Sequence, residues 1–132
     1  MIVLDASVIA KWFLEEPGSS SALYYRDLHL KRKEIIIVPN ILVYEIANVL
    51  LYKNFTEKEI ISALESLENF KIEVISLNFN DITKTAIFAK QREITAYDAA
   101  YVVLARNFNC KFITADKKLY KKVKDLGFVK LL

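Results

Sequence analysis

The chain has 132 residues, of which 54 % are hydrophobic and 27 % are charged, and its formal net charge at pH 7 is +3. This length and composition predict one folded domain over residues 1–132 and argue against a disordered chain. Because there are only one cysteine, one histidine and two glycines, the sequence excludes an internal disulfide, a zinc site of nitrogen and sulfur ligands, and a glycine-rich nucleotide-binding loop.

Short apolar strands alternate with helices in the first half of the chain. A helix that ends at Pro17-Gly18 follows the first strand, Ser19 to Ser21 are expected to cap the next helix, and Asn40 a third. In chain order we expect a strand at 2–4, helices at 8–16 and about 19–33, a β-branched strand at 35–38 and a helix through about residue 52.

The second half continues this alternation. Thr56 and Glu59 have the spacing of a capping box, which predicts a helix start just after Thr56. We expect helices from there to about 70, from 80 or 81 to about 92, at 95–107 and at 117–126, with strands at 72–77, 111–114 and 128–132.

Strands that alternate with helices predict an α/β fold in which right-handed crossovers build a parallel sheet covered by helices on both faces. In such sheets ligands bind beyond the carboxyl ends of the strands, where the strand order reverses. That edge of the sheet is where functional residues are expected.

Two aspartates follow predicted strands directly. Asp5 comes after residues 2–4, and Asp116 comes after residues 111–114 with one intervening alanine. Each also stands where the N-cap of the following helix is expected, which is a structural role that needs no chemistry. For either aspartate alone, capping is the simpler interpretation.

Glu45 and Asp98 are isolated charges in apolar helices. Glu45 is the only charged residue in 41–52, where Asn48 shares its helix face, so a narrow polar stripe is expected to face inward or into a cleft, with a surface-facing Glu45 as the alternative. Asp98 is the only charge in 95–105, although Thr95 and Asp98 also fit a capping box. A buried carboxylate without a partner is costly, and the usual partner is a proton or a cation.

The four acids Asp5, Glu45, Asp98 and Asp116, called here the acidic quartet, can meet at one edge of the sheet. Four like charges in one place repel, and a hard divalent cation relieves that repulsion. Oxygen ligands select Mg²⁺ or Mn²⁺ over zinc.

The same residues resemble a known family. Asp5-Ala6-Ser7 after an N-terminal strand, Glu45 six residues beyond Pro39, Tyr97-Asp98-Ala99 at the start of an apolar helix, and Ile113-Thr114-Ala115-Asp116 after a strand are together similar to a PIN domain, in particular to the VapC toxins of prokaryotic toxin–antitoxin pairs. The resemblance covers the whole chain. It implies a three-layer α/β/α fold with a central parallel sheet of order 3-2-1-4-5.

The resemblance also implies an activity, which is Mg²⁺- or Mn²⁺-dependent endoribonuclease cleavage of single-stranded RNA, often tRNA, leaving 5′-phosphate and 3′-hydroxyl ends. Asp5, Asp98 and Asp116 would be the metal ligands. Glu45 would position or deprotonate the attacking water, with Ser7 and Thr114 as supporting polar groups.

Partners follow from the resemblance as well. Family members pair as homodimers and are inhibited by a small VapB-like antitoxin. The consecutive apolar residues Trp12, Phe13 and Leu14 leave open whether one of them faces a partner or all belong to an irregular amphipathic helix. Without the acidic quartet, 12 acidic residues remain against 19 basic ones, a balance of +7 that suits a polyanionic substrate, although charge alone favours a soluble lysine-rich protein.

The lysines after Asp116 are candidates for binding the phosphates that flank the cut, although a solvated helix face is the default interpretation. They are Lys117, Lys118, Lys121, Lys122 and Lys124. His29, in a Lys- and Arg-rich stretch, is expected to be a surface residue without a catalytic role.

The sequence gives two expectations about location. No apolar run approaches the roughly 18 to 20 residues that span a bilayer, so no membrane association is expected. The N-terminal residues lack the features of a signal peptide, and a single cysteine, Cys110, suits a reducing compartment, so a cytoplasmic protein is expected.

Two other function classes remain open. A phosphotransfer enzyme would use Asp5 as its nucleophile, but such sites commonly need a second acid two positions later, where this chain has Ser7. A non-catalytic RNA- or protein-binding module would bind RNA equally well with and without EDTA.

Overall fold

A computed structural model describes all residues, 1–132, and contains a five-stranded parallel sheet of order β3-β2-β1-β4-β5. The strands are β1 (Ile2–Leu4), β2 (Ile36–Pro39), β3 (Glu73–Ile75), β4 (Lys111–Thr114) and β5 (Val129–Leu131). The helices are α1 (Ala6–Ile9), α2 (Ser19–Leu30), α3 (Ile41–Tyr52), α4 (Glu57–Asn69), α5 (Phe79–Arg92), α6 (Ala96–Asn107) and α7 (Lys117–Val123), and short 3₁₀ turns extend α1 to Trp12 and α7 to Leu126.

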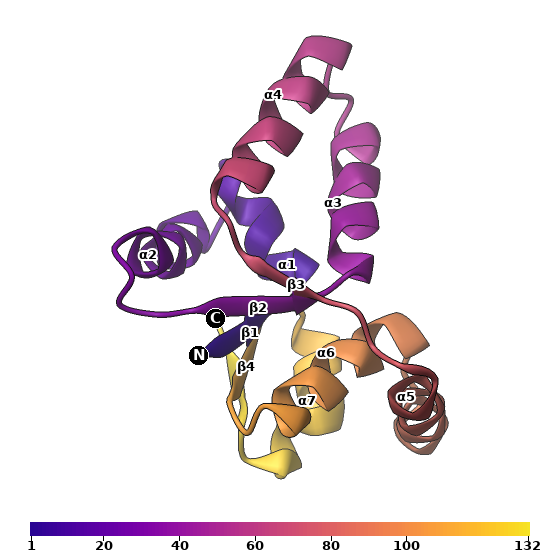
Figure 1. Ribbon diagram of the computed structural model, residues 1–132. Coiled ribbons are helices and arrows are strands. Elements are labelled where there is room, and N and C mark those ends of the chain that lie inside the picture. The colour runs from indigo at the N-terminus through magenta and orange to yellow at the C-terminus, as the bar shows by residue number, and fades with distance from the viewer.

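The sheet lies between two layers of helices. Figure 1 shows α1 to α4 on one face and α5 to α7 on the other. This arrangement follows from the strand order, because the chain moves outward from β1 to β3, then returns across the opposite face to reach β4. The expected three-layer α/β/α fold and strand order are confirmed. None of the helices combines the length and apolar composition needed to span a membrane.

The central strands are buried on both faces, which explains their uninterrupted apolar sequences. Every residue of β1 and β2 is buried, and so are Phe112 to Thr114 of β4. Helix α6 packs across β1, β2 and β4. Its Tyr101 is completely buried and stacks on Phe112, with ring centroids 5.9 Å apart. The core therefore lies directly beneath the end of the sheet where the functional residues were expected.

Helix capping chemistry places several boundaries differently from the sequence-based prediction. The Asp5 carboxylate accepts the backbone N–H of Val8, so α1 begins at Ala6 and not at residue 8. The first helical segment ends at Trp12, whose indole N–H donates to the carbonyl of Ala22 at 2.9 Å. The capping box of Thr56 and Glu59 is confirmed.

Two expected caps are wrong. Asn40 precedes α3 but its side chain accepts no capping hydrogen bond, because its backbone is already helical. Gly18 occupies the N-cap position of α2, and the Ser19 hydroxyl instead donates to the carbonyl of Leu14 at 2.7 Å. At its other end α2 stops at Leu30, three residues earlier than expected, and Arg32 has a positive φ of 56°.

Trp12, Phe13 and Leu14 all contact the core, Trp12 as a buried residue and the other two as half-buried ones. Trp12 is buried and meets Phe70 edge-on, with ring centroids 5.6 Å apart. Phe13 stacks on the same ring at 6.4 Å, and Leu14 packs beside them. These contacts agree with the irregular amphipathic helix, and a partner contact of this segment stays a prediction.

His29 is a structural residue and not simply a surface one. Its Nδ1 accepts the backbone N–H of Ile36 at 3.2 Å, which leaves Nε2 to donate to the carbonyl of Phe70 at 3.0 Å. The ring thereby joins the end of α2 to β2 and to the turn before β3. The expectation that His29 takes no part in catalysis stays a prediction.

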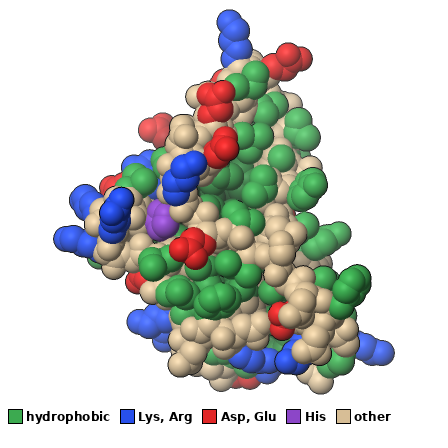
Figure 2. All heavy atoms as spheres, viewed as in Figure 1, with side chains coloured by type: hydrophobic (Ala, Val, Ile, Leu, Met, Phe, Trp, Pro, Cys, Tyr) green, Lys and Arg blue, Asp and Glu red, His purple; other side chains and the backbone are tan.

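Hydrophobic and basic side chains separate on the surface. In Figure 2, hydrophobic side chains gather where α3 and α4 lie side by side, and Lys and Arg side chains lie mainly at the margins of the view. The exposed members on α3 include Tyr44, Leu51 and Tyr52. An exposed apolar surface of this kind is typical of a region that meets another molecule.

Candidate active site

Strands β1 and β4 are neighbours in the sheet, and their carboxyl ends form the point at which the strand order reverses. Leu4 pairs with Ile113 in the parallel register, so Asp5 and Thr114, each one residue further along, also lie side by side. Asp116 follows two residues later at the start of α7. Two acids are thus brought to the edge where α/β proteins bind ligands.

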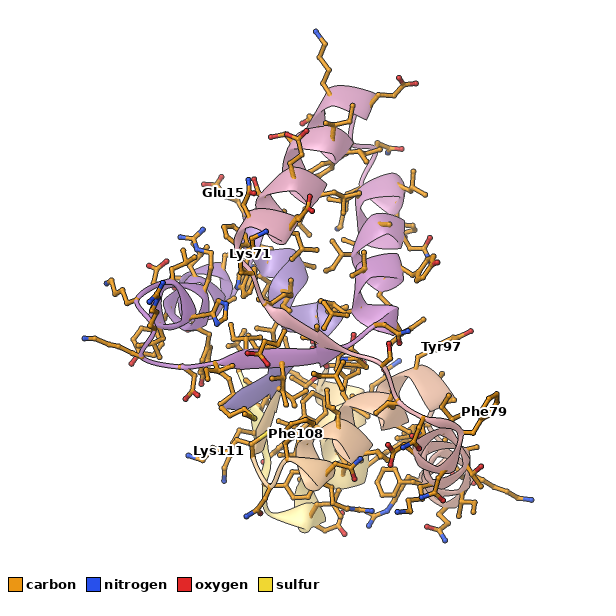
Figure 3. All side chains as sticks on the ribbon, viewed as in Figure 1. Glu15, Lys71, Phe79, Tyr97, Phe108 and Lys111 are labelled. Carbon is orange, nitrogen blue, oxygen red and sulfur yellow. The ribbon has the colours of Figure 1, made fainter.

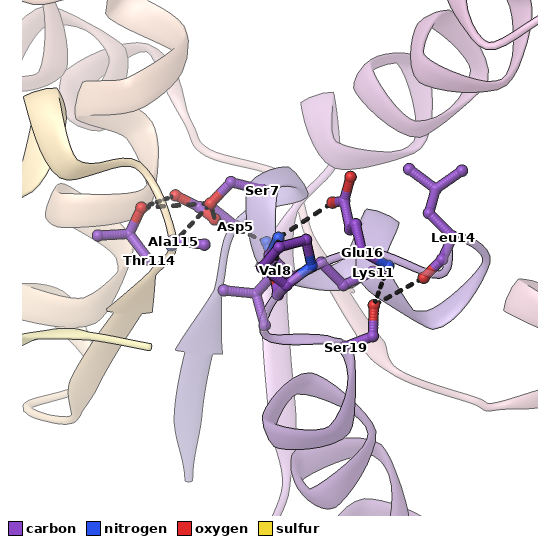
Figure 4. Close-up of polar contacts among 10 residues, drawn as sticks. Asp5, Ser7, Val8, Lys11, Leu14, Glu16, Ser19, Thr114 and Ala115 are labelled. Atoms are coloured by element: carbon purple, nitrogen blue, oxygen red, sulfur yellow. Dashed lines mark hydrogen bonds and ion pairs between the residues drawn. The ribbon is translucent and has the colours of Figure 1, made fainter.

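Asp5 is held by hydroxyl groups. Its side chain is buried, with 5 % of the residue exposed, and its Oδ1 accepts the Ser7 hydroxyl while its Oδ2 accepts the Thr114 hydroxyl, each at 2.5 Å. Figure 4 shows these contacts at the junction of the two segments. Two uncharged donors therefore fix the orientation of the buried Asp5 carboxylate.

The same two hydroxyls also order the segment after β4. Ser7 Oγ accepts the backbone N–H of Ala115 at 2.8 Å, and Thr114 Oγ1 accepts that of Asp116 at 3.0 Å. Asp116 Oδ1 in turn caps α7 by accepting the backbone N–H groups of Lys118 and Leu119. The capping interpretation of Asp5 and Asp116 is thus confirmed, while Asp116 Oδ2 has no protein donor.

Glu45 is held by a residue that the sequence reasoning missed. The Tyr101 hydroxyl donates to Glu45 Oε1 at 2.6 Å, from a ring that is fully buried beneath the sheet edge. Burial raises the pKa of Tyr101 above its ordinary value, so the hydroxyl remains a proton donor. The signal in the sequence was the spacing, because Tyr101 comes three residues after Asp98 and shares its helix face.

The acidic quartet is electrostatically coupled. Burial raises the pKa of Asp5 to about 6, and the nearby Asp98 adds to this rise. Burial followed by the charge of Asp98 raises the pKa of Glu45. The pKa of Asp98 is raised first by its own burial and then by the charge of Asp116. Asp98 is therefore the one acid whose charge interacts with each of the other three.

No basic side chain neutralises these charges. The four ion pairs of the protein are Met1–Glu34, Lys11–Glu16, Arg26–Asp27 and Arg92–Asp125, and none includes a member of the quartet. Carboxylate oxygens with unrelieved mutual repulsion are a donor set that fits Mg²⁺ or Mn²⁺. The side chains as placed nevertheless contain no group of three or more potential ligands arranged around one point. The carboxylate oxygens therefore suit a hard cation, although their side chains do not surround a single cation position.

A cavity of about 780 Å³ opens beside the quartet between α1 and α3. Its wall includes Glu45, Asn48, Ser7 and Ala115. The expected polar stripe of Glu45 and Asn48 thus does line a cleft. Asp5, Asp98 and Asp116 lie next to this cavity but do not form its wall.

Replacing Tyr101 by phenylalanine tests whether it positions Glu45. Phenylalanine keeps the stack on Phe112 but removes the donor to a carboxylate, a hydrogen bond worth about 1.5 to 3 kcal/mol, so we expect any reaction that uses Glu45 to become about tenfold slower or more. Because this hydrogen bond lowers the pKa of Glu45, the acidic limb of the pH–rate profile should move to higher pH. Tyr52→Phe on α3 is the control. An unchanged profile in Tyr101→Phe would remove the positioning role.

Comparisons with known proteins agree with this fold. The family model described as PIN domain matches residues 2–125. Ribonuclease VapC3 of Pyrobaculum aerophilum is 30 % identical over 127 residues, which cover 92 % of this chain and 93 % of that protein.

Solved structures are similar in fold at lower identity. VapC20 of Mycobacterium tuberculosis, described as a sarcin–ricin loop cleaving toxin, superposes with a TM-score of 0.72 at 14 % identity, covering 98 % of this chain and 97 % of that one. FitAcB of Neisseria gonorrhoeae gives a TM-score of 0.66 at 18 % identity, covering 100 % and 96 %. At these identities the structures establish the shared fold alone.

Proposed function

This chain belongs to the PIN domain family, and from that premise we propose that it is a Mg²⁺- or Mn²⁺-dependent endoribonuclease that cuts single-stranded RNA. The observation that carries the proposal is the acidic quartet, four coupled carboxylates without any basic partner at the reversal point of a parallel sheet. Such a set of charges is costly to the fold alone and suits a site for a cation. The relative named Ribonuclease VapC3 supports the same chemistry.

The four acids of the quartet have two different proposed roles. Asp5, Asp98 and Asp116 would hold the cation, and Glu45, on the cavity wall, would receive the proton of the attacking water. When bound, a divalent cation supplies Lewis-acid polarisation of the phosphate and charge stabilisation during the displacement. The water oxygen would bond to phosphorus as the bond from phosphorus to O3′ breaks, and O3′ would take up a proton from solvent. The products would then carry 5′-phosphate and 3′-hydroxyl ends.

Ser7 and Thr114 serve as positioning residues in this proposal. Their hydroxyls donate to the two oxygens of Asp5 and at the same time accept backbone N–H groups of the Asp116 segment. They therefore set the direction of Asp5 and the place of Asp116 together. Donors fixed in advance lower the reorganisation needed during reaction.

We further propose that the protein is the toxin of a type II toxin–antitoxin pair, with a VapB-like antitoxin as inhibitor, a homodimer as its assembly and tRNA as a candidate substrate. The relatives named VapC support this role. Leu51 and Tyr52, exposed apolar side chains of α3 that lie outside the cavity wall, offer surface for a partner. The proposed location is the cytoplasm, where a toxin of this kind would meet RNA.

Cleavage of end-labelled RNA tests the proposal directly. Wild type with Mg²⁺ or Mn²⁺ should cut single-stranded RNA into fragments with 5′-phosphate ends, and leave the matching duplex and the DNA strand intact. Asp98→Asn should be inactive, while Asp125→Asn, which alters an exposed acid that pairs with Arg92, should cut normally. A wild type that binds RNA equally with and without EDTA but never cuts it would instead support a non-catalytic binding module.

A further inference from the structure

Two exposed tyrosines stand beside the acidic quartet without a structural reason for their exposure. Tyr44 is 74 % exposed and Tyr97 is 60 % exposed. Each comes one residue before a member of the quartet, Tyr44 before Glu45 on α3 and Tyr97 before Asp98 on α6. Two helices from opposite faces of the sheet thus each present an aromatic ring next to a carboxylate.

Both rings belong to the wall of one cavity. Tyr44 and Tyr97 line the 780 Å³ cavity that also contains Glu45 and Ser7. Figure 3 shows Tyr97 projecting outward from the start of α6, on the side where α3 begins. Neither hydroxyl makes a hydrogen bond within the protein, and neither ring stacks on another aromatic side chain. Their faces are therefore available to a ligand.

A second cavity adjoins the first, and the two together are called the groove here. The second cavity, of about 430 Å³, shares Lys11, Glu16 and Ala115 with the first and extends to Lys117. Lys53 lines the first cavity at the C-terminal end of α3. A basic residue thus stands toward each end of the groove.

The lysines that line the groove differ in whether an ion pair already neutralises them. Lys11 is neutralised by Glu16, at 3.0 Å, and also donates to the carbonyl of Pro17 (Figure 4). Lys53 and Lys117 form no ion pair. The groove therefore combines two free cations, two exposed aromatic faces and a central acidic site that needs a cation of its own, which is complementary to a polyanion with flat apolar groups.

We propose that Tyr44 and Tyr97 are stacking platforms for unpaired RNA bases on the two sides of the phosphate that is cut. Lys53 and Lys117 bind backbone phosphates further along the strand. Stacking on an aromatic ring tolerates any base but requires a base that is not already stacked in a duplex, so the tyrosines supply the selectivity for single strands. The inference rests on the proposed ribonuclease function and assigns its substrate contacts.

The test pairs each tyrosine with the base it is proposed to hold. The substrates are a labelled single-stranded RNA with one mapped cleavage site and the same RNA with abasic ribose at the two positions that flank the cut. On the intact RNA, Tyr44→Ala and Tyr97→Ala should each lower kcat/KM about tenfold or more. On the abasic RNA, each variant should fall within about twofold of wild type, because the stacking partner is already gone.

Two further variants separate stacking from an apolar protein contact. Tyr44→Leu keeps an apolar surface but cannot stack, so it should lose as much as Tyr44→Ala. Tyr24→Ala is the matched control, because Tyr24 is 60 % exposed on α2, as Tyr97 is on α6, but lies outside both cavity walls, and it should cleave as wild type does. Equal losses on intact and abasic RNA, or a changed sedimentation coefficient without a loss on intact RNA, would assign the tyrosines to a protein interface and overturn the proposal.

Binding without cleavage separates this proposal from the proposed function. Fluorescence anisotropy in EDTA, with a labelled ten-nucleotide single strand and its fully abasic counterpart, measures the same coupling in the uncut RNA. If the wild type cuts no RNA but Tyr44→Ala and Tyr97→Ala weaken binding only to the strand with bases, the stacking platforms stand and the nuclease function fails. If the wild type does cut RNA and both variants bind like it, the platforms fail alone.

Discussion

Asp5→Asn should reduce RNA cleavage by at least about a thousandfold, because removing one ligand of a catalytic cation costs on the order of 4 kcal/mol of transition-state stabilisation. Asparagine has nearly the same shape but no charge. One of the two hydroxyls, of Ser7 and Thr114, keeps donating to the remaining oxygen, and the other can rotate its proton away and accept an amide N–H of the asparagine. The fold should therefore persist while the activity is lost.

The same substitution should stabilise the metal-free protein at neutral pH. Burial raises the pKa of Asp5 from 3.8 to about 6, so the folded chain retains a proton between these pH values that the unfolded chain releases. Stability therefore falls as the pH rises from about 4 to about 6 and stays lower above that window, a difference of about 3 kcal/mol. Asparagine removes this dependence, and we expect a gain of about 1 to 3 kcal/mol at pH 7.

Urea unfolding in EDTA at pH 4.5 and pH 7, together with a cleavage assay in Mg²⁺, measures both effects. The variant should be inactive and more stable than wild type at pH 7, with a smaller advantage at pH 4.5. Glu65→Gln, at an exposed acid of α4 that forms no ion pair, is the control. Wild-type activity in Asp5→Asn would contradict the role of Asp5 as a metal ligand. A lower stability than wild type at pH 7 would show that the Ser7 and Thr114 hydroxyls need a negatively charged acceptor.

Withdrawal of the divalent cation should abolish cleavage and lower the melting temperature. In its absence the four carboxylates repel each other without a basic partner, whereas binding to the folded state alone stabilises that state by mass action. At a Mg²⁺ concentration about 100 times its dissociation constant, the gain is about 2.7 kcal/mol, which corresponds to about 10 °C for a chain of this size.

Thermal unfolding in EDTA and in increasing Mg²⁺ measures this shift. The Asp98→Asn variant should lose most of the rise in melting temperature that Mg²⁺ produces. The charge of Asp98 raises the pKa of Asp5 and of Glu45, and the charge of Asp116 raises the pKa of Asp98. NaCl at matched ionic strength controls for general screening. Equal melting temperatures in EDTA and Mg²⁺, with cleavage unaffected by EDTA, would exclude a cation site in the quartet.

Much of the fold was accessible from local sequence signals. Strand β4 was predicted at its observed residues and the capping box before α4 was confirmed, because β-branched runs and side-chain caps act over a few residues. The strand order came from the family resemblance, since pairing between distant strands leaves little trace in a single sequence. Boundaries set by tertiary contacts, such as the end of the first helix at Trp12, were missed for the same reason.

The candidate site was predictable in its acids but not in their supports. Asp5 and Asp116 follow from strand ends, and Glu45 and Asp98 stand out as lone charges in apolar helices. Tyr101 was missed because a tyrosine in an apolar helix looks like core until its hydroxyl is seen on Glu45. The coupling among the acids depends on four segments meeting in space, which no local pattern reports.

The most direct test is a crystal structure of the protein soaked in MnCl₂, in which anomalous scattering locates the manganese. The account predicts a manganese peak at about 2.1 Å from carboxylate oxygens of Asp5 and at least one of Asp98 and Asp116, with Glu45 facing it. Manganese bound elsewhere, or a quartet that stays open with no peak at saturating MnCl₂, would contradict it.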